Sequence, residues 1–294
     1  MAPRTRRRNF QEKPMAISIN TNSSALVALQ QLNATNRELD ITQNRVSTGY
    51  KVANSKDDPS TFAVAQKQRA DLDAYDAVDQ SAQHGLNILD VTIKSLESIS
   101  NLLIEMKAKA VQAANQALTP QDRLLINADY QAYVAQVTTV INSATFDNIN
   151  LINKNPVVPA TDDLIVITEP TASTAASIIV SAINVQASTI ALMGSVDTPA
   201  NAVTEIASLN GMMQFVNSAL ASMGSNSSRL ESHSGFVKKL QDSLTIGIGF
   251  LVDADLTAES AKLKSVQIQQ QLSAQSLQIA NSRPQLILAL FQDT

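Results

Sequence analysis

One apolar stripe constrains the fold of this chain more than any other feature. Its residues recur three and four positions apart, which is the spacing of one face of an α-helix. A continuous helix over 60–117 would be roughly 85 Å long at about 1.5 Å per residue. A compact globular core does not need a helix of that length, so the stripe predicts a long helical rod. The stripe consists of Leu86, Leu89, Ile93, Leu96, Ile99, Leu103, Met106, Ala110 and Ala113.

Two helix starts share a Thr-Pro signal, in which Thr is the N-cap and Pro the first helical residue. Thr119-Pro120 predicts a helix that turns back along the first, and Thr198-Pro199 predicts a later one. The first of these helices has the stripe Ile126, Tyr130, Tyr133, Val137, Val140 and Ala144. The second has Ile206, Leu209, Met213, Val216, Leu220, Met223, Ser227, Leu230, Ser234, Val237, Gln241 and Leu244.

The two ends of the chain carry helical patterns that have no partner nearby in the sequence. Near the N-terminus, steps of four and three give Ala25, Leu29, Leu32, Asn36, Leu39, Gln43 and Val46. That helix is expected to end at Gly49, before the polar connector KVANSKDDPS. The segment 272–291, LSAQSLQIANSRPQLILALF, supplies a matching pattern at the other end. We therefore expect the two ends to pair with each other.

The middle of the chain loses the helical period between Phe146 and about Thr198. There PVVPATDDLIVITEP places a β-branched run between prolines, which favours strand and loop. The predicted fold is therefore mainly α: a long antiparallel helical rod or coiled coil whose terminal helices pair, with a short β and loop insertion in the middle.

Composition excludes several classes of function. The chain has no Cys, so it can form no disulfide, thiol nucleophile or thiolate metal site. It has no apolar run of about 18 residues and no Sec-type signal, so we expect no membrane insertion and, if it is exported, another export route. Residues 1–14 are basic and could bind nucleic acid, but we interpret 1–15 as a disordered extension or an N-terminus assigned too early, with Met15 as the start. We expect no nucleic-acid partner.

The sequence gives no sign of catalysis, a cofactor or a metal site. His84 and His233 lie in no metal-ligand spacing and are interpreted as surface or helix-flank residues. Asp57 and Asp58 precede Pro59 and are interpreted as shaping a turn rather than as an acid/base pair. No Gly-rich phosphate loop is present. We predict that the protein is not an enzyme.

Several separate motifs resemble those of bacterial flagellins, in the family's order. In the first half they are INTNSSALVALQQLN, RVSTGYKVANSKDDPS, GLNILDVTIKSLESISNLL, KAVQAANQ and FDNINLI; at the end they are VDADLTAESAKLKSVQIQQQL and SLQIANSRPQLILALF. The resemblance covers about 16–152 and 206–291. Because only about fifty residues separate the two parts, the chain is similar to the minimal flagellins common in alphaproteobacteria.

The resemblance implies a division of the chain into filament domains. The inner, filament-core domain would combine 16–53 with 253–294, and the surrounding rod would combine 54–152 with 198–252. The short variable region 153–197 would face the medium. The inner-domain assembly seam would consist of Leu29, Leu32, Leu39, Val46, Leu263, Val266, Leu277 and Leu286.

The same resemblance implies the function, the partners and the location. The chain would be a secreted subunit that self-assembles into the extracellular flagellar filament for swimming motility. Its partners would be copies of itself, the hook-associated junction and cap proteins, and the flagellar type III export machinery with its chaperone. Inner-domain ends of this kind are expected to be disordered in the monomer and to fold on assembly.

Flagellins that activate a Toll-like receptor of innate immunity present an Arg, a Leu four residues later, and a Glu from the next helix. Aligning KAVQAAN with the family motif puts Glu105, Lys109 and Asp129 at these positions. The first substitution reverses the charge, so weak or no receptor recognition is implied. Alternatively, Glu105 and Lys109 form an ordinary helix-stabilising surface pair; the two interpretations are compatible.

Two other functions remain open on the sequence. One is a hook–filament junction protein, which has similar helical ends but caps the filament. The other is a secreted coiled-coil adhesin or effector. The sequence does not distinguish a major from a minor flagellin, the handedness of the filament, or whether hydroxyls of the middle, such as Ser173, Thr174 and Ser177, carry O-linked sugars.

Overall fold

The computed structural model describes residues 21–154, 163–170, 177–190 and 193–292, and it divides the chain into two compact units. The first unit combines residues 1–66 with 248–294, and the second consists of residues 67–247. The fold class is confirmed: long helices dominate the described residues, and two short strands are the only sheet among them.

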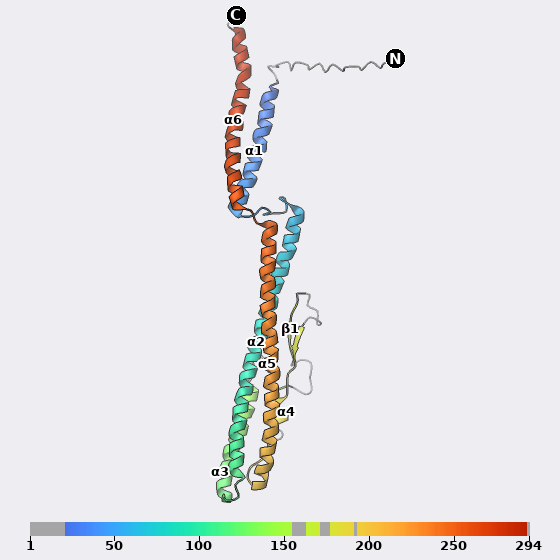
Figure 1. Cartoon of the computed structure of the whole chain (residues 1–294), viewed down its shortest axis with the longest axis vertical. Helices are drawn as coiled ribbons and strands as arrows, with labels where there is room; N and C mark the ends of the chain where they lie inside the picture. Colours follow the sequence, from blue (N-terminus) through green and yellow to red (C-terminus); the bar gives the residue numbers. More distant parts are fainter. Residues whose placement is uncertain (1–20, 155–162, 171–176, 191–192, 293–294) are drawn as a thin grey trace, which may run out of the picture. The chain divides into compact units, whose positions relative to one another are not determined.

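The first unit contains α1 (Ser23–Thr48) and α6 (Leu256–Gln292), which lie side by side and antiparallel (Figure 1). The Asn22 side chain caps α1 by accepting a hydrogen bond from the Ala25 amide at 3.0 Å. At the other end Gly49 adopts the left-handed conformation at φ 74°, and its N–H donates to the Arg45 carbonyl. The predicted helix end at Gly49 is therefore confirmed. The basic arm 1–14 lies outside the described residues.

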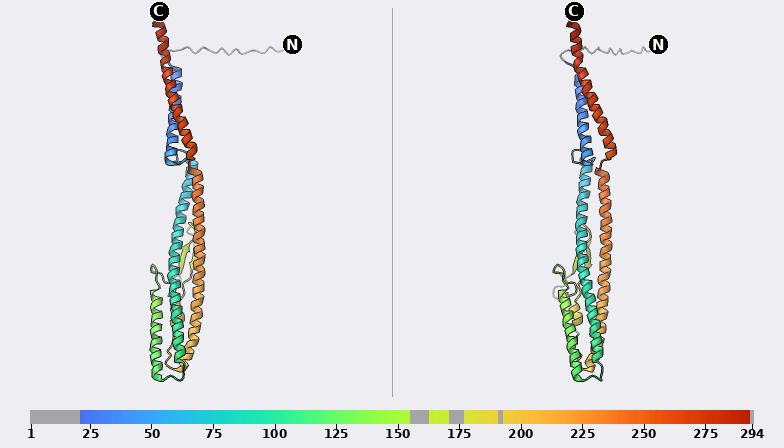
Figure 2. Two further views of the ribbon diagram at one scale, coloured as in Figure 1. Left: turned by 60° about the vertical axis from the view of Figure 1, so that its left-hand side comes forward. Right: turned by 90° about the vertical axis from the view of Figure 1, so that its left-hand side faces the viewer.

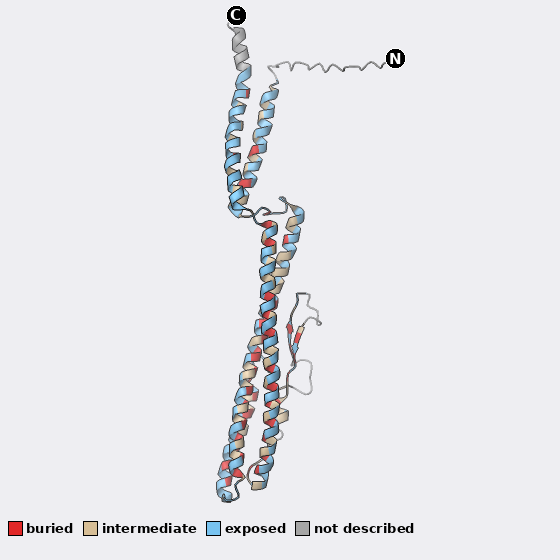
Figure 3. Cartoon of the chain, viewed as in Figure 1, coloured by how far each residue is buried: buried red, intermediate tan, exposed pale blue. Residues whose placement is uncertain are grey.

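The second unit contains all of α3 (Pro120–Ser143) and most of α2 (Pro59–Ala113) and α5 (Pro199–Val252); the start of α2 and the end of α5 belong to the first unit. In this unit α2 and α5 run antiparallel and α3 folds back along α2 (Figure 2). Both Thr-Pro starts are confirmed, since the hydroxyls of Thr119 and Thr198 accept from the Asp122 and Asn201 amides. All the predicted stripe residues of these three helices are buried or half-buried, as the red bands in Figure 3 indicate.

The middle of the chain is short and irregular, as expected, and contains one small helix that the sequence did not predict. Strands β1 (Leu164–Ile167) and β2 (Ser177–Val180) pair antiparallel, with Ile165 opposite Ile179. The helix α4 covers Val185–Thr189. Before them, Asp147 and Asn148 have φ 49° and 64° in a two-residue turn closed by Phe146 and Ile149. Two consecutive positive φ values are typical of a type I′ turn, which Asp and Asn tolerate.

A buried polar cluster ties α3 to α5. The Tyr130 hydroxyl donates to Glu205 Oε1 at 2.6 Å, and the other oxygen, Oε2, accepts from the Gly194 amide at 3.1 Å. Burial, together with the Glu205 carboxylate, raises the pKa of Tyr130. Tyr130 and Glu205 are almost fully buried, and each provides the hydrogen-bond partner of the other. Without that partner, either polar group would be costly to remove from water.

Gly85 lets the β-hairpin approach α2. A Cβ at this position would lie 2.7 Å from Val166 Cγ2 on β1 and 3.0 Å from Leu230 Cδ2 on α5. Both distances are shorter than ordinary van der Waals contact. The buried side of the hairpin therefore packs directly on the helix backbone, and only glycine leaves room for it.

Replacing Gly85 with Ala should loosen the hairpin. Overpacking typically costs about 1–3 kcal/mol, and this outweighs the gain of about 1 kcal/mol that Ala brings to a helix interior. We expect a lower free energy of unfolding and faster hydrogen exchange in β1 and β2. Gly211→Ala on α5 is the matched control, because no described atom lies within 4 Å of its new Cβ; it should stabilise the protein. Equal gains at both glycines would contradict the packing argument.

Candidate assembly surface

The two histidines form no metal site in the described part of the chain. Groups of three potential metal-ligating side chains are absent among the described residues, and none of the described helices is long and apolar enough to cross a membrane. His84 Nε2 lies 3.1 Å from Asp147 Oδ2, and His233 Nε2 lies 3.1 Å from the Thr168 carbonyl. Each histidine therefore contacts the middle of the chain from a long helix, a role that spacing alone did not indicate.

The α1 side of the helix pair differs in phase from the predicted stripe. Ala25, Leu32, Leu39 and Val46 are half-buried as expected, but Leu29 is 42% exposed and Gln43 is exposed. The alternate positions of the seam are Ala28, Thr35 and Thr42 instead. Each of these residues comes one position before a residue of the predicted stripe. Their side chains are smaller and allow α6 to approach closely. A strict spacing of four and three from Ala25 passes over these three positions and selects Leu29, Asn36 and Gln43, of which only Asn36 is half-buried.

The α6 side follows the predicted phase. Val266 is buried, and Leu263 and Leu277 are half-buried. Gln270 and Ser273 lie between them in the same half-buried row. The side chain of Leu286 lies outside the described residues. The larger side chains of α6 thus complement the small ones of α1.

Polar groups fix how α1 and α6 align. Gln270 Nε2 donates to Asn36 Oδ1 at 2.8 Å in the middle of the seam, and Asn22 Nδ2 donates to the Ala280 carbonyl at 2.7 Å near its end. At the opposite end Arg45 Nη1 lies 3.0 Å from Glu259 Oε1. A slip of one helix past the other would break all three contacts. A polar residue in an apolar seam typically specifies register in this way.

Both helices expose a second set of large apolar side chains that their pairing leaves uncovered. Most of the ribbon of α1 and α6 is pale blue in Figure 3, the colour of exposed residues. Apolar area left in water is unfavourable, at about 25 cal/mol per Å², and extended exposed apolar surface marks an interaction site. The residues are Leu26, Val27, Leu29 and Ile41 on α1 and Leu256, Ile268, Leu272 and Ile279 on α6.

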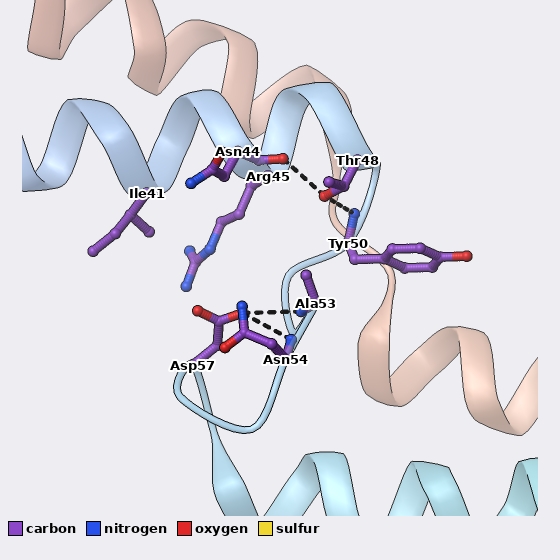
Figure 4. A pocket seen from close by; sticks show the side chains of 8 residues that line it. All are labelled: Ile41, Asn44, Arg45, Thr48, Tyr50, Ala53, Asn54 and Asp57. Atoms are coloured by element: carbon purple, nitrogen blue, oxygen red, sulfur yellow. Dashed lines mark hydrogen bonds between the residues drawn. The ribbon is translucent and has the colours of Figure 1, made fainter.

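A connector and a pocket adjoin the C-terminal end of α1. Backbone hydrogen bonds hold the connector against the end of α5: the amides of Lys51 and Val52 donate to the Val252 carbonyl at 2.7 and 3.2 Å. The last turns of α1 and residues 50–57 line a pocket of 280 Å³. Figure 4 shows the Arg45 side chain extending from α1 toward Asp57, with the Tyr50 ring turned away.

Asp57 and Asp58 shape this connector, as the sequence indicated. Asp57 Oδ2 accepts from the amides of Ala53 and Asn54 at 3.0 and 3.1 Å. Asp58 caps α2, because its carboxylate accepts hydrogen bonds from the hydroxyl and amide of Thr61 and of Ser60. These hydrogen bonds, led by the Thr61 hydroxyl, lower the pKa of Asp58 from 3.8 to about 2.

The three residues aligned with the receptor patch lie on α2 and α3. Glu105 is exposed, and Lys109 Nζ lies 2.6 Å from Asp129 Oδ2. The hydrogen bond to Asp129, with weaker attraction to Asp129, Tyr133 and Glu105, raises the pKa of Lys109. Lys109 thus pairs across two helices with Asp129 rather than along α2 with Glu105.

Comparison with known proteins identifies a family. Residues 19–156 match the model of the bacterial flagellin N-terminal helical region, and residues 193–291 match that of the C-terminal helical region. The chain is 39% identical over 282 residues to flagellin FljO of Caulobacter vibrioides, covering 94% of this chain and 98% of the relative. It is 34% identical to a flagellin of Brucella melitensis, covering 94% and 99%.

A solved structure shares the fold at low sequence identity. It is described as a flagellar hook-associated protein from Vibrio parahaemolyticus, and it matches with a TM-score of 0.55 at 16% identity. The match covers 67% of this chain and 99% of that one.

The cap of α2 should depend on pH. A carboxyl whose pKa is depressed on folding contributes stability that is complete above its unfolded pKa and is lost as pH falls through the folded value. The first turn of α2 should therefore stay capped above about pH 4 and fray as the pH approaches 2. The NMR chemical shift of the Thr61 amide measures this change. Asp58→Asn, which keeps a capping oxygen without a charge, should remove this pH dependence. A midpoint near 3.8 in the unchanged chain would contradict the assignment.

Proposed function

Because the chain belongs to the bacterial flagellin family and is a structural subunit of the flagellar filament, we propose that its paired terminal helices are the part that neighbouring copies complete on assembly. The observation that carries this proposal is the second apolar face of α1 and α6, which their pairing leaves exposed. Contacts between different surfaces of identical copies generate open helical filaments when the rotation does not close.

The other functions considered from the sequence are not favoured. Flagellins are structural filament proteins rather than enzymes. The two flagellin relatives are matched over 98% and 99% of their lengths. Family membership thus favours a filament subunit over a junction protein or a soluble adhesin. The filament that flagellins form is extracellular.

The division into filament domains is part of the proposal. Residues 16–53 and 253–294 would form the inner core of the filament, and 54–152 and 198–252 the surrounding rod, with 153–197 facing the medium. The two compact units support this assignment, because their limits at residues 66 and 248 fall near the ends of the proposed inner domain. The assembly seam would comprise Leu32, Leu39, Val46, Leu263, Val266, Leu277 and Leu286, together with Leu29, which is exposed in the single chain and would be covered by a neighbouring copy.

Export and capping follow from the same proposal. The subunit would leave the cell through the flagellar type III machinery with a dedicated chaperone, and the hook-associated junction and cap proteins would bound the filament. A sequence without Cys is compatible with passage as an unfolded polypeptide, since no disulfide can form on the way.

A chain that lacks 253–294 should remain folded but fail to form filaments. The second unit keeps its own core, so helicity by circular dichroism should persist. In the full-length chain, Val266→Asp should also abolish assembly, because it places a charge in the seam where Val266 is buried. Gln267→Asp, one residue away and exposed, is the matched control and should assemble. Electron microscopy after seeding is the measurement.

Hydrogen exchange provides the complementary readout. We expect the amides of α1 and α6 to exchange quickly in the monomer and slowly in the filament, since neighbouring copies would supply the missing contacts. Long filaments from the chain without 253–294, or equal protection in both states, would contradict the proposal.

We further propose that the receptor of innate immunity recognises this flagellin weakly or not at all. Glu105 would meet the receptor with an acid where an activating flagellin presents an Arg anchor, and loss of such an anchor commonly costs about 2 kcal/mol or more. Lys109 would add a second mismatch. Its ion pair with Asp129 supports this view, because the acidic side chain that remains is already engaged within the chain.

Restoring the two residues should restore recognition. The variant Glu105→Arg/Lys109→Leu supplies the anchor and frees Asp129, so its half-maximal concentration in receptor-expressing cells should fall by roughly 30-fold or more. Glu97→Arg makes the same charge reversal as Glu105→Arg at an exposed position two turns earlier on α2; it is the control and should change little. Full activation by the unchanged chain would refute the proposal.

A further inference from the structure

Phe250 is an aromatic side chain that its own chain leaves in water. It is 86% exposed, more than any other large apolar side chain in the described part of the protein. Its neighbours on α5, Ile248 and Val252, are both buried. At about 100° per residue, position 250 points away from the face that these two residues share. The ring therefore contributes almost nothing to the packing of the unit that carries it.

The backbone beneath Phe250 is held firmly. The Val252 carbonyl accepts hydrogen bonds from the Lys51 and Val52 amides, and the Asp253 amide donates to the Gly249 carbonyl at 2.8 Å. An exposed aromatic ring on a fixed helical turn loses little conformational entropy when a partner covers it. Rings of this kind typically serve as anchors at the centre of protein interfaces.

The pocket of Figure 4 lies in the same unit and suits a side chain better than a free ligand. Its volume of 280 Å³ falls just below the range of about 300–1,000 Å³ that is usual for small-molecule sites. Its apolar lining includes Ile41 and Ala53. Ile41 is 49% exposed, so the pocket offers apolar surface that no part of the described chain covers.

Much of the polar lining of the pocket is already hydrogen-bonded within the chain. Asp57 Oδ2 accepts two backbone amides, Arg45 Nη1 donates to Glu259, and the Thr48 hydroxyl donates to the Asn44 carbonyl. An apolar side chain in the pocket would therefore leave these hydrogen bonds intact, and the polar groups that make them would not be buried without a partner. The guanidinium of Arg45 also presents the cation that an aromatic ring attracts.

We propose that Phe250 of one filament subunit inserts into the pocket beside Arg45 and Ala53 of a second copy. The proposal rests on the assembly function above and names one contact within it. Phe250 and the pocket are different surfaces of the same unit. Each copy can therefore insert its own Phe250 into one neighbour and accept the Phe250 of another, as propagation of an open filament requires. The exposure of Phe250 shows that the ring does not occupy the pocket of its own chain.

Thiol crosslinking can test this contact on a clean background, because the chain has no Cys. Filaments are grown from an equal mixture of two single variants, Phe250→Cys and Ala53→Cys, one of which carries a size tag, and are treated with a short bis-maleimide. Residues 53 and 250 of one chain lie close together, because the Val52 amide donates to the Val252 carbonyl, and one thiol per chain prevents a link within a chain. We expect a crosslinked dimer of one tagged and one untagged chain on a denaturing gel. Neither variant alone can give this mixed dimer, and the unpolymerised mixture should not give it.

A matched pair defines specificity. Ser47 is exposed on the same part of α1 but does not line the pocket, so a mixture of Phe250→Cys and Ser47→Cys should give at least 10-fold less of the mixed dimer. Equal amounts of mixed dimer from both mixtures, or none from the Ala53 mixture in intact filaments, would overturn the contact and leave the assembly function standing. If the unmodified chain formed no filaments under any seeding condition, the assembly function itself would be contradicted.

A second measurement covers the case in which the cysteine variants assemble poorly. Phe250→Ser should raise the critical concentration for polymerisation about 10-fold or more, as loss of an anchor does, with unchanged helicity in the monomer. Phe250→Tyr, which retains the ring, should stay within a few-fold of the unchanged chain. Polymerisation of Phe250→Ser at the native critical concentration would overturn the proposal.

Discussion

The narrow seam between α1 and α6 is the interaction on which the rest of the first unit depends. Its α1 side is built from small residues, Ala28, Thr35 and Thr42, and its α6 side from Leu263, Val266 and Leu277. Two helices alone can bury only one face of each, so the apolar residues on their other faces stay in water. The seam therefore determines which apolar side chains of α1 and α6 are buried within one chain and which are left for another chain to cover.

Much of this organisation could be predicted from the sequence, because long helices leave strong periodic signals. The stripes of α2, α3 and α5 were predicted residue by residue, and the Thr-Pro caps indicated the starts of α3 and α5. The phase of α1 could not be predicted from α1 alone. Leu29 and Ala28 are adjacent candidates for one seam position, and only the size of the α6 side chains opposite decides between them. Phe250 was missed because a single exposed residue has no period.

The middle of the chain shows a different limit of sequence reasoning. The β-branched run LIVI predicted a strand, but the place where the strand docks depends on Gly85, about eighty residues earlier. A glycine inside a helical stripe predicts only a small loss of helix stability, and its purpose is visible only once Val166 lies against it. Similarly, the two histidines gained partners, Asp147 and the Thr168 carbonyl, that local spacing could not reveal.

The polar contacts of the seam hold α1 and α6 in one register although part of their apolar surface is left uncovered. An apolar pair of helices that must wait for neighbours could slide or pair in other registers, and such freedom would misplace every surface offered to the next copy. The Asn36–Gln270 hydrogen bond and the Arg45–Glu259 ion pair penalise such a slip, since each would leave a polar group unpaired in the seam. Arg45 also lines the pocket beside the connector. The Arg45–Glu259 contact that sets the register of α1 and α6 therefore also shapes the pocket. The two ends of a chain must pair correctly before the pocket can accept Phe250 of another copy.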